Sequence, residues 1–345
     1  MYANGKWFKE HPIPSSEQGN GLWQLIRDTL NSQILAICQS SVSKEYAKGS
    51  NKQKIGDFYY SGMDSVSLNS QGIKPLMKVL NRIDSIANLN DLVEQVAHIH
   101  QVSSSPLFGL YVAQDDRISS KYAINISQGG LSLPDRSYYL DQTDRAKMVR
   151  TRFLEYGKSL FTAMGYNEKD ASVAADRLLN LETALAKASR KREDTRDPFK
   201  NYNKLSLEQL MSQTPNFNWA LLFKSVGLSK VDSVIVGQPE FLKAENAYLK
   251  SYSLKDWKNY LKFQYVNGLA DFIDDSTYMK SFRLYSTTLR GIEEPKPRWK
   301  RVVDETDKQL GELIGQVYVA EYLPKGTKEK LLEIGNAIKV VYAER

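Results

Sequence analysis

Apolar residues recur at three- and four-residue spacing through residues 145–192, and one short interruption divides this stretch in two. Such spacing gathers apolar side chains on one face of a helix. Gly165 is suited to end the first helix, and Asn167, with Asp170 three residues later, to cap the second. The pattern therefore predicts two long antiparallel helices joined by a short turn. The positions expected on their apolar faces are Met148, Phe153, Tyr156, Leu160 and Ala163, then Ala171, Ala174, Leu178, Leu181, Leu185 and Ala188.

The same spacing predicts further helices and leaves little room for strands. The predicted helices carry Leu22, Ile26, Leu30, Ile34 and Ile37; Leu76, Val79, Leu80, Ile83 and Ile86 behind Pro75; and, capped by Asn90 or Asp91, Leu92, Val93, Val96 and Ile99. Residues 109–113 and 122–126 flank a turn-like segment and are expected to pair as a hairpin, while 233–236 is a short apolar run. The expected fold class is mainly α, a large multi-helix domain with a small β-hairpin. Residues 1–345 are expected to form one unit, because no linker divides them.

The net charge of +7 raises the question of an acidic partner. The basic residues concentrate at Arg190–Arg192 with Arg196, and at Lys296–Arg301. Neither cluster lies in a recognisable nucleic-acid-binding module, and acidic residues interrupt or flank both. A solvated face, or an interface with an acidic partner domain, is favoured over nucleic-acid binding. No apolar run approaches the roughly 20 residues of a membrane span, and the single cysteine, Cys38, is expected to pack as a small apolar residue.

Histidine is scarce, which bears on metal chemistry. The chain has three histidines, His11, His98 and His100, and no His-Glu-x-x-His pattern. A zinc peptidase site of that type places two histidines four residues apart on one helix face, with the intervening glutamate as general base. His98 and His100 are two apart, so a helix would point them to different faces. We therefore expect no metal site and no catalytic residue in this chain.

Several short motifs are distinctive when taken in order. They are Asn4–Trp7, Ile55–Tyr59, Gln128–Arg136, Leu181–Ala186, Pro297–Arg301 and Gly311–Val319. In this order and spacing the chain resembles the amino-terminal region of the neprilysin and endothelin-converting-enzyme family of zinc metalloendopeptidases. The resemblance extends from Tyr2 to about Arg345. Cysteines that pair in vertebrate relatives are replaced here, with Asn4 near one such position and Gly62 at another, which is typical of bacterial members.

The resemblance implies a fold and a function. Members of this family have two lobes: a thermolysin-like lobe that holds zinc, and a helical lobe that covers the active-site cleft and restricts access to oligopeptides. It implies that this chain is the helical lobe without its catalytic partner, inactive alone, with zinc confined to the missing lobe. The implied partners are the protein's own catalytic domain and peptide substrates, in the periplasm or at the cell surface. A free-standing helical module that binds peptides or proteins without catalysis remains the alternative.

Two residues are candidates for substrate contact because they align with the family's substrate-binding segment. Arg27 falls at the second of two family arginines that meet the carboxy-terminal side of the substrate, and Trp23 falls at a usual aromatic position. Arginine suits this task because its planar guanidinium can bind a carboxylate with two hydrogen bonds. The first arginine and the neighbouring aspartate fall at Gly19 and Gln24, so a complete carboxylate clamp is not expected. The alternatives are a surface ion pair of Arg27 with Asp28 or Glu17, and a packing role for Trp23, which is favoured.

The remaining motifs favour structural roles. Gly129, Gly130 and Pro134 suit a tight turn with positive φ. Gly311 and Gly315, four apart on an apolar helix, would let another helix approach closely. The acidic pair at 115 and 116 is expected to serve the hairpin turn rather than to bind a metal.

Overall fold

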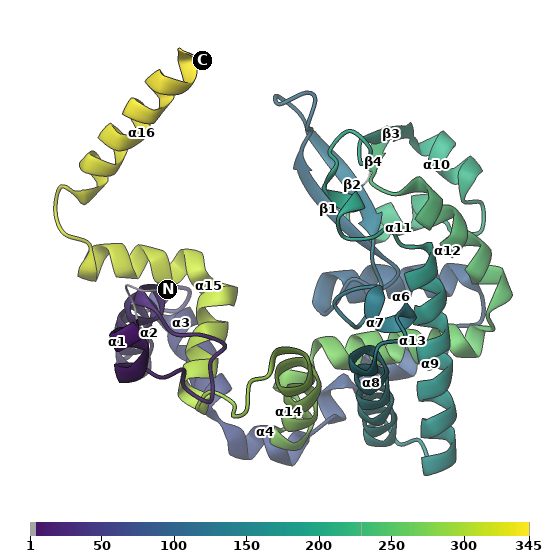
Figure 1. Ribbon diagram of the computed structural model, residues 1–345, viewed down its shortest axis with the longest axis horizontal. Coiled ribbons are helices and arrows are strands. Elements are labelled where there is room, and N and C mark those ends of the chain that lie inside the picture. Colours follow the sequence, from purple (N-terminus) through teal and green to yellow (C-terminus); the bar gives the residue numbers. More distant parts are fainter. Residues whose placement is uncertain (1–4, 229, 345) are drawn as a thin grey trace. The chain divides into compact units, whose positions relative to one another are not determined.

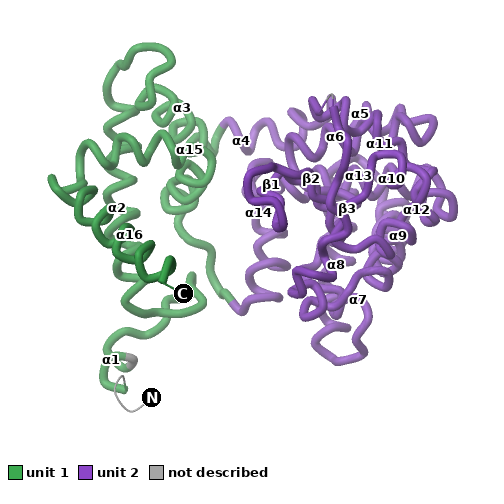
Figure 2. Tube along the Cα trace, turned by 90° about the horizontal axis from the view of Figure 1, so that it is seen from above, with its two compact units in different colours: residues 1–66, 292–345 green, residues 67–291 purple. Residues whose placement is uncertain are grey.

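The computed structural model describes residues 5–228 and 230–344, and the chain divides into two compact units. Unit 1 comprises residues 1–66 and 292–345, and unit 2 comprises residues 67–291 (Figure 2). The expectation of a single unit is therefore replaced by two. The helix α4 (Ser65–Gln71) runs through the boundary between residues 66 and 67, so no linker marks that boundary in the sequence. Asn4, where the first motif begins, lies outside the described residues.

Unit 1 is helical and combines both ends of the chain (Figure 1). Its helices are α1 (Gly5–Glu10), α2 (Leu22–Val42), α3 (Asn51–Met63), α15 (Arg298–Tyr322) and α16 (Thr327–Ala343). The core joins α2, α3 and α15 and consists of Ile34, Ile37, Cys38, Ile55, Tyr59, Val303, Ile314 and Val317. Trp299 packs against this core. The fold of unit 1 thus depends on residues more than 250 positions apart in the sequence.

Unit 2 holds the larger core and the sheet. Its α-helices are α5 (Met77–Asp84), α6 (Leu89–Val102), α7 (Ser137–Leu140), α8 (Asp144–Ala163), α9 (Glu168–Ala188), α10 (Leu207–Gln213), α11 (Trp219–Ser225), α12 (Pro239–Ser251), α13 (Leu254–Gly268) and α14 (Asp275–Phe282). Short 3-10 turns lie at Lys74–Leu76, Asp194–Arg196 and Ala270–Phe272, and a π-helical segment, Arg283–Thr288, follows α14. The prediction of a mainly helical fold with a small β element is confirmed.

The predicted pair of long helices is present as α8 and α9, which pack against each other. Gly165 has φ +93, and the Asn167 side chain accepts a hydrogen bond from the Asp170 backbone N–H, so both local signals are confirmed. Two residues predicted on the apolar face of α8 are not buried: 45% of the Met148 surface is exposed, and Ala163 is exposed as well. The predicted cap of α6 is also wrong: Asn88, not Asn90 or Asp91, accepts the hydrogen bonds of the first turn.

The predicted hairpin exists, but it belongs to a larger sheet. Strands β1 (Phe108–Gln114) and β2 (Tyr122–Gln128) pair antiparallel as expected. The sheet order is β1-β2-β4-β3, with β3 at Asn203–Ser206 and β4 at Ser233–Val236. Strand β4 runs parallel to β2 and antiparallel to β3. The structure therefore adds two strands to the hairpin, and β4 is buried along most of its length.

The Gly129–Gly130 turn follows β2 and lies against the body of unit 2. Gly130 has φ +74, and a Cβ there would lie 2.6 Å from the Tyr260 hydroxyl and 2.8 Å from the Leu107 carbonyl oxygen. The Tyr260 hydroxyl donates to the Gly130 carbonyl and accepts from the Leu107 N–H. A glycine is therefore required at 130 both by backbone conformation and by space.

The expected role of Gly311 and Gly315 is wrong. Apart from its own turn of helix, no atom of the described residues lies within 4 Å of a Cβ built at Gly315, and the Gly311 position meets only the Asp307 side chain of the same helix, at 3.8 Å. No other helix approaches there among the described residues. Instead α15 is kinked beside Gly311, where Leu310 has φ −122 and ψ 23.

Candidate functional site

The candidate substrate-binding residues lie in the first turns of α2, and a short loop determines where that helix begins. The Asn20 side chain donates to the carbonyl oxygens of His11 and Pro12, and its own carbonyl accepts from the Gly21 N–H. Gly21 then precedes the helix in extended conformation. These contacts fix the direction of the loop before Leu22.

The predicted apolar face of α2 is buried over only half of its length. Ile34 and Ile37 belong to the core of unit 1, whereas Leu22, Ile26 and Leu30 are exposed. We name the exposed set the α2 apolar face; its members are Leu22, Trp23, Leu25, Ile26 and Leu30, with exposed fractions from 37% to 79%. The expectation that one face of this helix would be buried throughout is therefore wrong in the first turns. Contiguous exposed apolar surface is typical of interaction sites.

Arg27 and Trp23 both lie exposed on this part of α2. Trp23 is 79% exposed, so it does not pack into a core of the described residues, contrary to the favoured expectation. The alternative ion pair of Arg27 is also absent from the described residues, because its expected partners are engaged elsewhere. Arg27 therefore presents a guanidinium with no partner among the described residues. Free guanidinium and exposed indole are the groups a peptide-binding surface would offer.

The acids near Arg27 instead neutralise the second basic cluster. Lys300 Nζ lies 2.7 Å from Asp28 and 3.6 Å from Glu17, and Lys296 Nζ lies 3.0 Å from Asp304. The hydrogen bond from Lys300 is the largest cause of the lowered pKa of Asp28. Much of the charge of this basic cluster is therefore neutralised by acids of the same chain.

Arg190, in the first basic cluster, also pairs within the chain. Arg190 binds the Glu240 carboxylate through two nitrogens and the Asn201 side chain through a third contact. Gln128, at the end of β2, bonds both the N–H and the carbonyl of Arg190. This arrangement ties the segment after α9 to the sheet.

Helix α16 is a second exposed apolar surface, and none of its residues is buried. We name it the α16 apolar surface; its large exposed members are Leu331, Leu332, Ile334, Ile338, Val340, Val341 and Tyr342. Within the described ranges, no helix is both long enough and apolar enough to cross a membrane. Exposed apolar surface of this extent is typical of an interaction site.

The histidines do not fit a metal centre. His100 Nε2 lies 3.1 Å from the Pro106 carbonyl oxygen, its ring stacks on Phe108, and burial lowers its pKa to about 4. His98 Nε2 accepts from Arg82, and burial is the main cause of its lowered pKa. Across residues 5–228 and 230–344, no group of three or more His, Cys, Asp or Glu side chains is placed to hold a metal ion. The described residues therefore do not supply a zinc site.

Cys38 is fully buried in the core of unit 1, as expected of an apolar residue. Burial raises the pKa of its thiol to about 12. Because the thiolate is the reactive form, we expect Cys38 to resist 5,5′-dithiobis(2-nitrobenzoate) in the folded protein and to react at once in denaturant. Absorbance at the thionitrobenzoate band measures both. Rapid reaction of the native protein would show that the core of unit 1 opens readily.

Comparison with known proteins identifies the family of the chain. The family model described as peptidase family M13 matches residues 1–345. The chain belongs to peptidase family M13. It is 27% identical over 364 residues to an endothelin-converting enzyme homolog of Locusta migratoria, covering 99% of this chain and 49% of the locust protein. It is also 27% identical to human membrane metallo-endopeptidase-like 1, covering 47% of that protein.

A solved structure agrees with the sequence relatives. The zinc metalloprotease Zmp1 of Mycobacterium tuberculosis, in complex with an inhibitor, matches with a TM-score of 0.89 at 26% identity. The match covers 95% of this chain and 50% of the Zmp1 chain. This chain therefore spans about half the length of the relatives it matches, and the predicted family is confirmed.

Proposed function

We propose that this chain is the non-catalytic lobe of a zinc metalloendopeptidase, which covers the active-site cleft of a catalytic domain and restricts access to oligopeptides. The observation that carries the proposal is the family match over the whole chain combined with coverage of only about half of each relative. The described residues supply no zinc site, so the chemistry is assigned to the other half. Zinc there would polarise the peptide carbonyl and activate water.

The two exposed apolar surfaces support the proposal that this chain covers the cleft and that a separate domain carries out catalysis. A lobe that covers a cleft needs a rigid helical body and apolar surface for its partner domain, and it needs no catalytic group. The α2 apolar face and the α16 apolar surface provide candidates for that contact. We propose the protein's own catalytic domain as the partner, peptides as the substrates, and the periplasm or cell surface as the location.

We assign substrate contact to Arg27 and, beside it, Trp23. The free guanidinium of Arg27 would bind the terminal carboxylate of a peptide, and Trp23 would pack on a side chain. With Gly19 and Gln24 in place of an arginine and an aspartate, Arg27 acts without the other members of the clamp. The preference for a free carboxyl terminus is therefore weaker than two arginines would give.

The test uses this sequence joined to an M13 catalytic domain. We expect the chain alone to bind no stoichiometric zinc and to cleave no quenched fluorescent peptide, and the joined protein to do both. Arg27→Ala should raise KM for a free-acid peptide roughly tenfold and leave the matching peptide amide unchanged. Arg177→Ala, an exposed arginine on α9, is the control. Peptidase activity of the chain alone would overturn the proposal, and equal effects on acid and amide would overturn the role of Arg27.

A further inference from the structure

Strand β1 forms one edge of the sheet in unit 2, and its outer side is open. The sheet order gives β1 the neighbour β2 on one side and no strand of the described residues on the other (Figure 1). The strand runs for seven residues, Phe108–Gln114. An unpaired strand exposes backbone groups that can pair with another chain. The substrate contacts assigned to Arg27 and Trp23 lie in unit 1 and make no use of this edge.

Two hydrogen bonds determine which backbone groups of β1 face outward. The Asp115 N–H donates to the Lys121 carbonyl oxygen, and this pair continues the register of β1 with β2. The Ile126 carbonyl, opposite Leu110, turns away from β1 and accepts from the Gly237 N–H. In an antiparallel pair, successive residues turn their N–H and C=O groups alternately toward the partner strand and away from it. The odd-numbered residues of β1 therefore face β2, and the even-numbered residues face outward.

Three residues thus present backbone groups in a row. Leu110, Val112 and Gln114 each point an N–H and a C=O outward, and no residue in the part of the chain that the structure describes bonds to these groups. Donors and acceptors alternate along the row, and a second extended backbone carries the complementary row. This complementarity identifies the occupant of the edge as an extended peptide segment.

The two edges of the sheet differ in their protection against such pairing. Strand β3, at the opposite edge, has four residues and carries Lys204, whose Nζ lies 2.9 Å from the Asp115 carboxylate. Short length and a lysine are features that discourage the addition of another strand. Strand β1 contains no charged residue and no proline, and its register with β2 is continuous, without a bulge. The edge at β1 therefore lacks the features that block strand addition.

Apolar side chains flank the open edge on both faces of the sheet. Val112 is 57% exposed and Tyr111 is 52% exposed, and as neighbours on a strand they point to opposite faces. Half-buried Leu110 lies on the same face as Val112. The side chains of an added peptide strand alternate in the same way, so they meet an apolar group on either face. Because β1 carries no charge, neutral and apolar peptides fit this edge best.

We propose that β1 binds an extended peptide segment as an added strand of the sheet. The outward N–H and C=O groups of Leu110, Val112 and Gln114 hold the peptide backbone, and Val112 and Tyr111 contact its side chains. Recognition through the backbone accepts many sequences, which suits a lobe that handles varied oligopeptides. The proposal rests on the proposed function for the origin of the peptide, but the binding itself needs only residues of unit 2.

The experiment measures peptide binding to the whole chain by fluorescence anisotropy. The probe is a capped, fluorescent peptide of alternating valine and threonine, N-methylated at every second residue. This pattern blocks one edge of the peptide, which prevents self-pairing, and leaves the other edge open. We expect saturable binding of the probe and binding weaker by roughly tenfold or more for the matched peptide that is N-methylated throughout.

Capped ends keep this test separate from the proposed function. The probe has no terminal carboxylate for Arg27, and its binding requires no peptidase activity. Failure of the probe to bind therefore overturns the strand addition and leaves the comparison of acid and amide peptides for Arg27 standing. Failure of that comparison leaves probe binding standing.

Variants at one position locate the binding. Val112→Pro removes an outward N–H and leaves the hydrogen bonds of β1 to β2 in place, so it should weaken probe binding by roughly tenfold. Val112→Thr keeps both the N–H and a branched side chain and should bind as the parent does. Circular dichroism confirms that each variant is folded.

Three results overturn the proposal. They are equal binding of the fully N-methylated peptide, unchanged affinity in folded Val112→Pro, and a concentration-dependent dimer in sedimentation that Val112→Pro abolishes. The last result assigns the edge to a second copy of this chain instead of a peptide.

Discussion

Replacement of Gly130 by alanine is expected to destabilise unit 2 by roughly 3 kcal/mol or more, lowering its Tm by about 10 °C. Two costs add. The positive φ of +74 disfavours any L-residue, and the new Cβ would lie 2.8 Å from the Leu107 carbonyl oxygen and 2.9 Å from the Leu107 Cα. Neither backbone atom can rotate away, unlike the end of a flexible side chain. Fluorescence of the buried Trp219 and Trp257 during urea unfolding measures the change.

Gly165→Ala is the matched control, because it separates the two costs. Gly165 has φ +93, but no atom lies within 4 Å of the Cβ it would gain. We expect a loss of about 1 kcal/mol there, from backbone conformation alone. Gly315→Ala has neither cost and should be neutral or slightly stabilising. Equal losses at 130 and 165 would show that the contacts with Leu107 and Tyr260 carry no weight.

The stability of unit 2 is expected to fall as the pH rises, through the buried carboxyl of Glu182. Burial raises the pKa of Glu182 from 4.5 to about 7, although hydrogen bonds from Ser132, Tyr139 and Gln264 oppose the shift. Because the folded state then holds a proton that the unfolded state releases, the contribution of Glu182 to stability is complete below pH 4.5 and lost above pH 7. The expected loss between pH 5 and pH 9 is roughly 2 to 3 kcal/mol.

A comparison with Glu182→Gln isolates this carboxyl. Burial raises the pKa of Glu245 too, and the lowered pKa of His100 acts in the opposite direction below pH 6.5. Both groups remain in the variant, so they cancel in the difference between the two proteins. That difference in unfolding free energy should shrink from pH 5 to pH 9, whereas Asp176→Asn, on the exposed side of α9, should give a constant difference. A constant difference for Glu182→Gln would contradict the shifted pKa.

Local signals explain what the sequence could predict. The α8 and α9 pair follows from apolar period, a positive-φ glycine and a capping asparagine, all of which act within a few residues. The hairpin follows from two short runs beside a turn. Strand β3 was missed because Asn203–Ser206 carries one apolar residue in four and gains its partners from β4, about 30 residues later.

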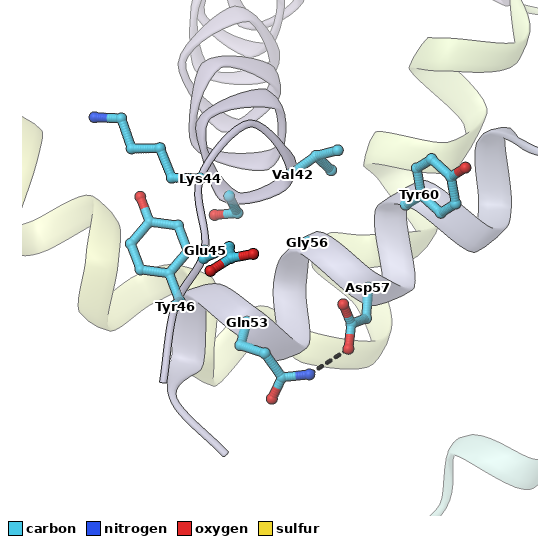
Figure 3. Close-up of a pocket in the computed structure, with 9 residues that line it drawn as sticks. Val42, Lys44, Glu45, Tyr46, Gln53, Gly56, Asp57 and Tyr60 are labelled. Atoms are coloured by element: carbon cyan, nitrogen blue, oxygen red, sulfur yellow. Dashed lines mark hydrogen bonds between the residues drawn. The ribbon is translucent and has the colours of Figure 1, made fainter. Parts of the chain in front are cut away.

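Long-range packing explains which features the sequence could not predict. The apolar period of α2 predicts a face but not what covers it, so Leu22 and Trp23 were placed inside while the structure leaves them exposed. The ion-pair alternative for Arg27 failed because Lys300, some 270 residues away, binds Asp28. The close approach of α3 to α2 at Gly56 (Figure 3), where a Cβ would overlap the Ser41 carbonyl oxygen, has no sequence motif either, because it is a contact between two separate helices.

The division of unit 1 between the two ends of the chain has a consequence for synthesis. Unit 2 is complete once residue 291 has left the ribosome, whereas the core of α2 and α3 must wait for α15, which begins at Arg298. Helices α2 and α3 are therefore made before unit 2, but they complete their core after it. Closing an unstructured loop of this length costs about 5 kcal/mol of chain entropy, and a folded unit 2 removes much of that cost by fixing the ends of the loop. During that wait the thiol of Cys38, which the finished core buries, is exposed to solvent.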